Sequence, residues 1–251
     1  MDRGPVQIEF DDHVASVALN DPLRHNALGI AMFDALDVAL GELASNEAAR
    51  VILLHGRGPS FCAGFDLSAA RDDPAVMATF IRRLSTLLRA LRRAPQPVVA
   101  AVHGAAIAGG CAIVSACDLV VVSATAKLGY PVHRLGVSPA VTISTLQAAV
   151  GPGGARALLM GGELLDGAAA QRIGLATQVS RDDAAVGRDA MTLCKTLSGH
   201  GAAALRATKA WLNELDGTID DGRLDGPVQD SADLAASEAG QAELVRRMRK
   251  H

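Results

Sequence analysis

Short apolar runs alternate with longer amphipathic stretches over the first 140 residues of the chain. Four of the runs are β-branched, are closed by Gly, Asn or Ser and have the length of buried strands, namely residues 14–19, 51–56, 97–104 and 118–123. Apolar residues recur at helical spacing in two stretches between them, residues 29–45 and 73–94. Strands that alternate with helices require crossover connections, so the pattern predicts a layered α/β fold.

The pattern becomes almost entirely helical after residue 140, with one further short strand expected over residues 175–180. The stretch 216–227 is rich in Asp and Gly and is expected to be a loop. The helical tail is apolar on one face, which suits either packing on the parent domain or an oligomer surface. We therefore predict a core of residues 1–197 followed by a C-terminal helical region of residues 198–251.

Composition narrows the class of protein. Hydrophobic residues make up 49% of the 251 residues and charged residues 20%, which is typical of a globular chain with a large core. The 24 Lys and Arg nearly balance the 27 Asp and Glu, so no net field attracts nucleic acid or an anionic membrane. No apolar segment has the length of a membrane span, and charges occupy the N-terminal stretch where a signal peptide needs an apolar run. We therefore expect a cytoplasmic protein that binds no nucleic acid and has no membrane span.

The four cysteines form neither a metal-binding nor a disulfide pattern. None belongs to a CxxC pair, and Cys111 and Cys117 are too far apart along a helix to ligate one tetrahedral ion. A reducing compartment and small buried side chains are the simpler interpretation. The sequence therefore predicts no metal site.

A glycine-rich stretch, HGAAIAGGCAIVSACD at residues 103–118, invites comparison with phosphate-binding loops. A P-loop needs Lys followed by Ser or Thr after its last glycine, whereas Gly110 is followed by Cys111. The other candidate, GRGPSF at residues 56–61, lacks the third glycine of a dinucleotide fingerprint because position 61 is Phe. Neither stretch predicts a nucleotide cofactor.

Two segments of small residues follow predicted strands and suggest a different kind of site. FCAGFDL (61–67) follows the strand 51–56, and AAIAGG (105–110) follows the strand 97–104. A helix that begins near Gly109 has first amides without intrahelical partners, and they carry the positive end of its dipole. A carbonyl oxygen held between the amides of Gly109 and Ala63 is stabilised as it gains negative charge, as in an oxyanion hole.

Five segments, in matching order, resemble the enoyl-CoA hydratase/isomerase, or crotonase, family: LNDPLRHNAL (19–28), FCAGFDL (61–67), residues 97–131, residues 158–179 and ALRATKAWLNE (204–214). The resemblance implies an α/β fold, a crotonase-like spiral of ββα units in two nearly perpendicular sheets with a C-terminal helical oligomerisation region. It implies a homotrimer or a hexamer that is a dimer of trimers. It also implies an acyl-CoA thioester as substrate, with coenzyme A as part of that substrate and no covalently bound cofactor.

The same resemblance assigns the site residues. The backbone amides of Ala63 and Gly109 are implied to hold the thioester oxygen and to stabilise an enolate. A solvated surface position explains Arg24 equally well, and helix capping explains Asp66. The positions implied to contact the substrate are Arg24, His25, Ala27, Asp66, Leu67 and Lys209.

The resemblance breaks at both carboxylates that hydration requires as base and acid. In hydratases the first glutamate lies three residues after the oxyanion glycine, where this chain has Ala112. The second follows a proline, and here Val132 occupies that position after Pro131. Standard two-glutamate hydration is therefore not expected.

His133 and Tyr130 are the candidate replacements for these carboxylates. His133 carries an imidazole, a side-chain type that commonly serves as a base, but as the neighbour of Val132 it is expected to point the other way. The Tyr130 hydroxyl can donate to a thioester or a carboxylate, although packing with that hydroxyl satisfied explains the residue as well.

We therefore predict an acyl-CoA-binding enzyme of enolate chemistry, a lyase or isomerase that performs decarboxylation, isomerisation or a related reaction. Decarboxylation is attractive because loss of CO2 forms the enolate without a strong base. One alternative is a non-catalytic acyl-CoA binding or carrier protein. Another is an assembly subunit, which the intact oxyanion segments favour less.

Overall fold

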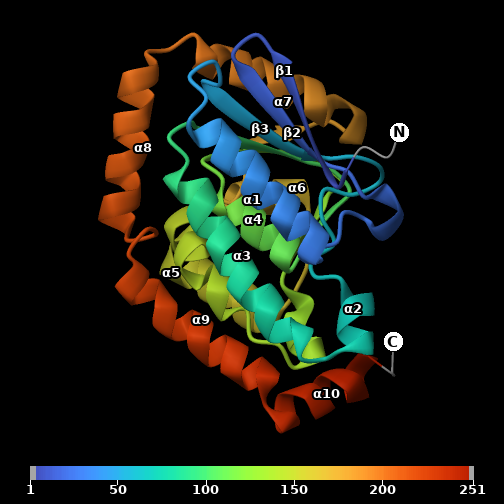
Figure 1. Ribbon diagram of the computed structural model, residues 1–251. Coiled ribbons are helices and arrows are strands. Elements are labelled where there is room, and N and C mark those ends of the chain that lie inside the picture. The colour runs from blue at the N-terminus through green and yellow to red at the C-terminus, as the bar shows by residue number, and fades with distance from the viewer. Residues whose placement is uncertain (1–3, 249–251) are drawn as a thin grey trace.

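The computed structural model describes residues 4–248, apart from the side chains of Asp72, Arg134 and Arg247. The larger sheet has six strands in the order β1-β2-β3-β4-β6-β8, and β5 and β7 form a separate two-stranded sheet. Figure 1 shows the β1, β2 and β3 end of the larger sheet. The strands are β1 (Val6–Asp11), β2 (Val14–Leu19), β3 (Val51–Gly56), β4 (Val98–Val102), β5 (Ala105–Ile107), β6 (Leu119–Ser123), β7 (Lys127–Gly129) and β8 (Gln178–Ser180).

Helices follow most of these strands along the chain. The 3₁₀ helices of the described residues are η1 (Pro22–Arg24), η2 (Pro131–Leu135) and η3 (Ala140–Thr142). The α-helices are α1 (Ile30–Ala44), α2 (Leu67–Asp72), α3 (Val76–Arg93), α4 (Gly109–Ala116), α5 (Ile143–Gly161), α6 (Gly167–Arg172), α7 (Asp183–Ser198), α8 (Ala202–Asp216), α9 (Asp221–Ala236) and α10 (Glu238–Met248).

The larger sheet begins with an antiparallel hairpin and continues with parallel strands. β1 pairs with β2, and β2, β3, β4, β6 and β8 then run parallel. The predicted strands 14–19 and 51–56 are confirmed to the residue, and 97–104 and 118–123 each contain a strand. Parallel neighbours need long crossovers, which the intervening helices supply. The predicted α/β fold class is confirmed.

Two apolar layers enclose the sheet. Helices α1, α3 and α4 cover one face (Figure 1). Phe33 and Phe80 pack there in the same core as Leu54 of β3. Helix α7 covers the other face, where Val186 packs near Val51. Because the central strands are buried on both faces, they are apolar throughout rather than alternating.

All four cysteines are buried free thiols, and the predicted burial of Cys111 and Cys117 is confirmed. Burial raises the pKa of each thiol to about 12, so the thiolate form is scarce near neutral pH. Among the described residues, no group of three or more His, Cys, Asp or Glu is arranged to hold a metal ion.

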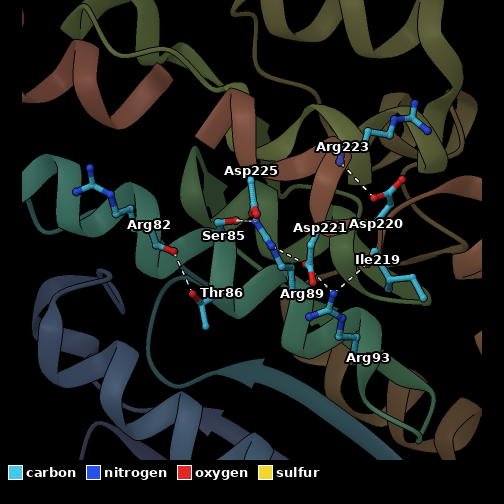
Figure 2. A network of polar contacts seen from close by, with 10 residues as sticks. All are labelled: Arg82, Ser85, Thr86, Arg89, Arg93, Ile219, Asp220, Asp221, Arg223 and Asp225. Carbon is cyan, nitrogen blue, oxygen red and sulfur yellow. Dashed lines mark hydrogen bonds and ion pairs between the residues drawn. The ribbon is translucent and has the colours of Figure 1, made fainter. Parts of the chain in front are cut away.

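The expectation of a loop over residues 216–227 is wrong from Asp221 on, where helix α9 begins. The Asp220 carboxylate caps this helix by accepting the backbone amide three residues further on, at 3.2 Å. Figure 2 shows ion pairs from helix α3 to the same helix, with Arg89 2.6 Å from the carboxylates of both Asp221 and Asp225. These contacts between distant segments outweigh the low helix propensity of Asp and Gly.

Helix α8 runs along the outside of the molecule (Figure 1). Its outer face presents Trp211, Leu212 and Leu215, whose exposed fractions are 65%, 58% and 86%. No helix within residues 4–248 has the length and apolar character that crossing a membrane requires. The division of the chain into residues 1–197 and 198–251 stays a prediction.

Candidate active site

An apolar cavity of about 250 Å³ lies between α3, the start of α4, and the 3₁₀ helices η2 and η3. Its walls come from four parts of the chain, namely residues 63–67, helix α3, residues 107–112 and residues 130–142. Both segments of small residues that the sequence singled out therefore meet at one cavity.

Helix α4 opens onto this cavity, and Gly109 is its first residue. The preceding Ala108 has φ +52° and ψ −110°, a conformation that costs a non-glycine residue about 1–3 kcal/mol. Two backbone hydrogen bonds hold it there: its amide donates to Gly129 O at 2.8 Å, and its carbonyl accepts from the Ala112 amide at 2.9 Å. The Gly109 amide has no acceptor within the described chain, as expected in the first turn of a helix.

The facing segment corrects one predicted donor. The Ala63 amide donates to the His25 carbonyl at 3.0 Å, so it is not free to bind a ligand. Phe65 forms a parallel bridge with Leu28. In this bridge, the residue before Phe65 and the residue after it are each hydrogen-bonded to Leu28. In such a bridge the amide of the middle residue points the opposite way. Phe65, which lines the cavity, therefore has an amide without an acceptor in residues 4–248, whereas the Ala63 amide has one.

Glycines allow the two segments to approach each other. Gly64 has φ +95°, and a Cβ on it would lie 3.6 Å from the Gly109 nitrogen. A Cβ on Gly110 would lie 2.2 Å from the Cys62 carbonyl oxygen, so no larger residue fits. The amides of Phe65 and Gly109 thus lie on adjoining backbone segments at the cavity wall.

The described side chains that line the cavity include no carboxylate and no imidazole. Ala112 and Val132, the two positions where hydratases carry glutamate, both lie at the cavity wall. The polar side chains among the lining residues are the hydroxyls of Tyr130, Ser138 and Thr142. The site can hold an apolar acyl group and donate two hydrogen bonds to one oxygen of a ligand. The described lining side chains supply no strong base.

The two candidate replacements take different places. His133 is exposed, its Nε2 lies 2.8 Å from the Leu159 carbonyl oxygen, and it does not line the cavity. Tyr130 does line it, and its hydroxyl lies 2.9 Å from Thr142 Oγ1. Burial raises the pKa of Tyr130 well above its ordinary value, so the phenol stays protonated.

Arg24 lies beside the segment that carries the Phe65 amide. It pairs with Asp21 at 2.8 Å and with Asp66 at 3.4 Å, while 63% of its side chain is exposed. His25, at φ +51°, holds Ser60 Oγ at 3.0 Å through Nδ1. The guanidinium keeps exposed donors that can bind a phosphate.

The remaining predicted contacts have mainly structural partners. Asp66 caps α2 by accepting two backbone amides, at 3.0 and 3.4 Å. Burial alone would raise the pKa of Asp66, but the hydrogen bond from the Ser68 hydroxyl, these two amides and the charge of Arg24 bring it below its ordinary value. Ala27 donates its amide to the Arg24 carbonyl at 3.0 Å. Leu67 lines the cavity, with 37% of its surface exposed.

Lys209 lies away from the cavity and is only 6% exposed. Its ammonium pairs with Asp118 at 2.7 Å and donates to the carbonyls of Leu91 at 3.0 Å and Gln96 at 2.9 Å. Burial lowers the pKa of Lys209, and the charge of Asp118 opposes this shift. All three ammonium protons have acceptors inside the chain, so Lys209 has no donor left for CoA.

The protein has a mainly parallel sheet covered by helices, and the N-terminus of one helix opens onto an apolar cavity. This arrangement is typical of ligand-binding α/β proteins. The sequence profile of the enoyl-CoA hydratase/isomerase family matches residues 9–218. The chain belongs to this family, also called the crotonase family.

Individual relatives agree with this assignment. A Thermus thermophilus protein provisionally named enoyl-CoA hydratase is 37% identical over 222 residues, which cover 86% of this chain and 87% of the relative. The crystal structure of an enoyl-CoA hydratase from Mycobacterium avium matches with a TM-score of 0.84 and 28% identity, covering 98% of this chain and 97% of that one. An enoyl-CoA hydratase/isomerase from Mycobacterium paratuberculosis matches with a TM-score of 0.87 and 23% identity, covering 97% of this chain and 98% of that one. The predicted crotonase fold is confirmed.

Proposed function

We propose that the protein binds an acyl-CoA thioester and holds its carbonyl oxygen between the backbone amides of Phe65 and Gly109. The observation that carries this proposal is the pair of unpartnered amides on adjoining segments of one apolar cavity. Both amides are fixed before the ligand arrives, and one belongs to a helix N-terminus. They therefore stabilise the negative charge of an enolate at little reorganisation cost.

The reaction that this site supports best is decarboxylation of a 2-carboxyacyl-CoA. Loss of CO2 leaves an electron pair that the thioester carbonyl takes up as an enolate, so no protein base has to remove a carbon-bound proton. An apolar wall also destabilises the carboxylate relative to neutral CO2. Water addition, in contrast, needs an acid and a base, and the described lining side chains hold neither a carboxylate nor an imidazole.

Coenzyme A enters as part of the substrate, and no separate cofactor is required for this chemistry. Arg24 is the proposed phosphate contact because it is an exposed cation beside the Phe65 segment. His25 and Ala27 shape the same turn, and Leu67 borders the acyl group at the cavity wall.

A panel of thioesters tests the proposed reaction. Enoyl-, 3-hydroxyacyl- and malonyl-type CoA esters are incubated with the protein and followed by mass spectrometry. The expected result is loss of CO2 from the malonyl type and no water addition to the enoyl type. Tight binding of every ester with no mass change would instead support a second candidate function, that of a non-catalytic acyl-CoA carrier. The absence of a carboxylate and an imidazole among the described lining side chains also fits a carrier.

Arg24→Ala is expected to raise KM about fivefold and to leave kcat unchanged, since a phosphate contact worth about 1 kcal/mol is lost far from the reacting atoms. The increase should shrink at high salt. Arg181→Ala is the matched control, because Arg181 is an exposed arginine that pairs with Asp182 at the start of α7. Equal effects of the two substitutions on KM would remove Arg24 from the CoA site.

We also propose a homotrimer, or a hexamer formed as a dimer of trimers, located in the cytoplasm. The proposal rests on the family resemblance. The apolar residues Trp211, Leu212 and Leu215 on the outer face of α8 support it, because so many large apolar side chains are seldom exposed together on a monomer.

A further inference from the structure

A chain of buried hydroxyl groups leads away from the apolar cavity. The Tyr130 hydroxyl lies 2.9 Å from Thr142 Oγ1, which lies 3.3 Å from Ser115 Oγ, which in turn lies 2.8 Å from Thr145 Oγ1. Each of the four residues is at most 4% exposed. Tyr130 and Thr142 line the cavity, whereas Ser115 and Thr145 lie behind it.

The chain ends at a second cavity, of about 130 Å³, between α3, α5 and α9. Thr145 lines it together with Ser85, Arg89 and Ser144. Arg89 Nε and Ser144 Oγ are buried and have no hydrogen-bond partner within the described chain. These polar atoms lie at a cavity that is large enough for water, which satisfies such groups.

This second cavity is reached from the surface of the molecule. Arg223 and Pro227, which also line it, are both exposed. Figure 2 shows its wall, in which Arg89 bonds to Ser85 Oγ at 3.2 Å and carries the ion pairs to helix α9. The two cavities are separate, and Val141 contributes to the lining of each.

The hydroxyl chain can be ordered in two directions. In one, each hydroxyl donates away from the apolar cavity, so that Tyr130 donates to Thr142 and Ser115 donates to Thr145. In the other, each hydroxyl donates toward the cavity, so that Thr142 donates to Tyr130 and the Tyr130 proton is free for a ligand. Passing one proton along the chain converts one order into the other.

We propose that Tyr130, Thr142, Ser115 and Thr145 form a proton relay that protonates the enolate at its α-carbon with a proton drawn from water in the second cavity. The relay rests on the proposed decarboxylation, which leaves an enolate that must be protonated. It explains how a cavity whose described lining side chains include no carboxylate can complete that reaction.

Water supplies the proton that the reaction consumes. The bond between the α-carbon and the carboxylate breaks, CO2 leaves, and its electron pair becomes the enolate. The α-carbon then takes the Tyr130 proton, each hydroxyl is refilled by the next one along the chain, and Thr145 is refilled by water. The hydroxide that remains combines with CO2 as bicarbonate. Because the transfers are concerted, the high pKa of Tyr130 is no obstacle, since no free phenolate accumulates.

The position of Tyr130 suits this role. The carbonyl of its neighbour Gly129 accepts the Ala108 amide at 2.8 Å, which places Tyr130 beside the residue that precedes Gly109. Arg92 donates to the Ser115 carbonyl at 2.9 Å, so a buried cation lies next to the middle of the chain. A cation at that point favours the extra electron density that a hydroxyl carries while its proton moves.

The test is decarboxylation of methylmalonyl-CoA in deuterated water, because its product gains one deuterium at a prochiral α-carbon. Wild-type protein should release CO2 and give product of a single configuration. Tyr130→Phe should still release CO2 but give racemic product, since solvent then delivers deuterium to either face. Thr145→Val should lower the multiple-turnover rate at least tenfold with unchanged ligand affinity, because Thr145 does not line the acyl cavity.

Two controls separate a relay from a merely structural network. Thr145→Ser keeps the hydroxyl and should restore the rate. Thr86→Val removes a hydroxyl that donates to the Arg82 carbonyl on the exposed face of α3, and it should behave as wild type. CO2 release with single-configuration product at wild-type rates in both Tyr130→Phe and Thr145→Val overturns the relay. Absence of CO2 release from the wild type overturns the proposed function instead.

Discussion

Replacing Gly109 with proline is expected to lower kcat/KM about 10²–10³-fold relative to Gly109→Ala, because proline removes one of the two amides that hold the thioester oxygen. Gly109 is the first residue of α4, the helix position at which proline is most common and at which its missing N–H breaks no intrahelical bond. Steady-state kinetics with the best substrate of the thioester panel measure the ratio.

Gly109→Ala is the matched control because it adds a Cβ and keeps the amide. That Cβ would lie 2.9 Å from Leu28 Cδ1, the end of a flexible side chain that can shift. Both variants should bind CoA itself equally well. Equal kcat/KM for the folded alanine and proline variants would remove the Gly109 amide from the reaction.

Asp118→Asn is expected to lower the free energy of unfolding by about 3 kcal/mol, because it leaves the Lys209 ammonium buried without its counter-charge. Asparagine has the same shape and can still accept the Val98 amide, which Asp118 holds at 2.7 Å. Asp118 is 21% exposed, which keeps the expected loss at the low end for a buried pair. Denaturant unfolding followed by circular dichroism measures it.

Two further variants give this stability prediction its controls. Asp11→Asn breaks the pair between Lys195 and Asp11, whose side chains are 50% and 45% exposed, and should cost far less stability than Asp118→Asn because solvent screens this pair. Lys209→Met in the Asp118→Asn background should recover part of the stability, since it removes the unpaired charge. A double variant less stable than Asp118→Asn alone would show that hydrogen bonding, not charge, dominates at Lys209.

The sheet was predictable because its strands are local patterns. Val14–Leu19 and Val51–Gly56 are short, β-branched and bounded by turn residues. Residues close in the sequence therefore determine where each strand begins and ends. Helix α9 was not predictable in this way. The ion pairs that link it to Arg89 and Arg93 come from residues about 130 positions earlier in the chain, and no local pattern contains them.

The site was predictable at the level of segments but not of single amides. The small residues of 61–67 and 105–110 indicated where a backbone approaches a ligand. Which amide is free depends on the partners of the others, and the Ala63 amide is used by His25, 38 positions away. Neighbouring amides in an extended segment point to opposite sides, and it is the bridge to Leu28 in the folded chain that selects Phe65.

Lys209 and the hydroxyl chain illustrate the same limit. The motif around Lys209 indicated a ligand contact, but its ammonium is enclosed by residues of α3 and by Asp118. Ser115 and Thr145 carried no signal in the sequence, since isolated hydroxyls in apolar helices are common. Their role depends on the distance between a hydroxyl of α4 and a hydroxyl of α5, which only the folded chain defines.

The polarisation of a bound thioester carbonyl tests the central claim most directly. An acyl-CoA labelled with ¹³C at the thioester carbonyl is bound to the wild-type protein, and its stretching frequency is measured by infrared difference spectroscopy. Two amide donors should shift the band to lower frequency than in water, and Gly109→Pro should abolish most of the shift while Gly109→Ala retains it. A carbonyl band at its solution frequency in the saturated wild-type complex would contradict the account.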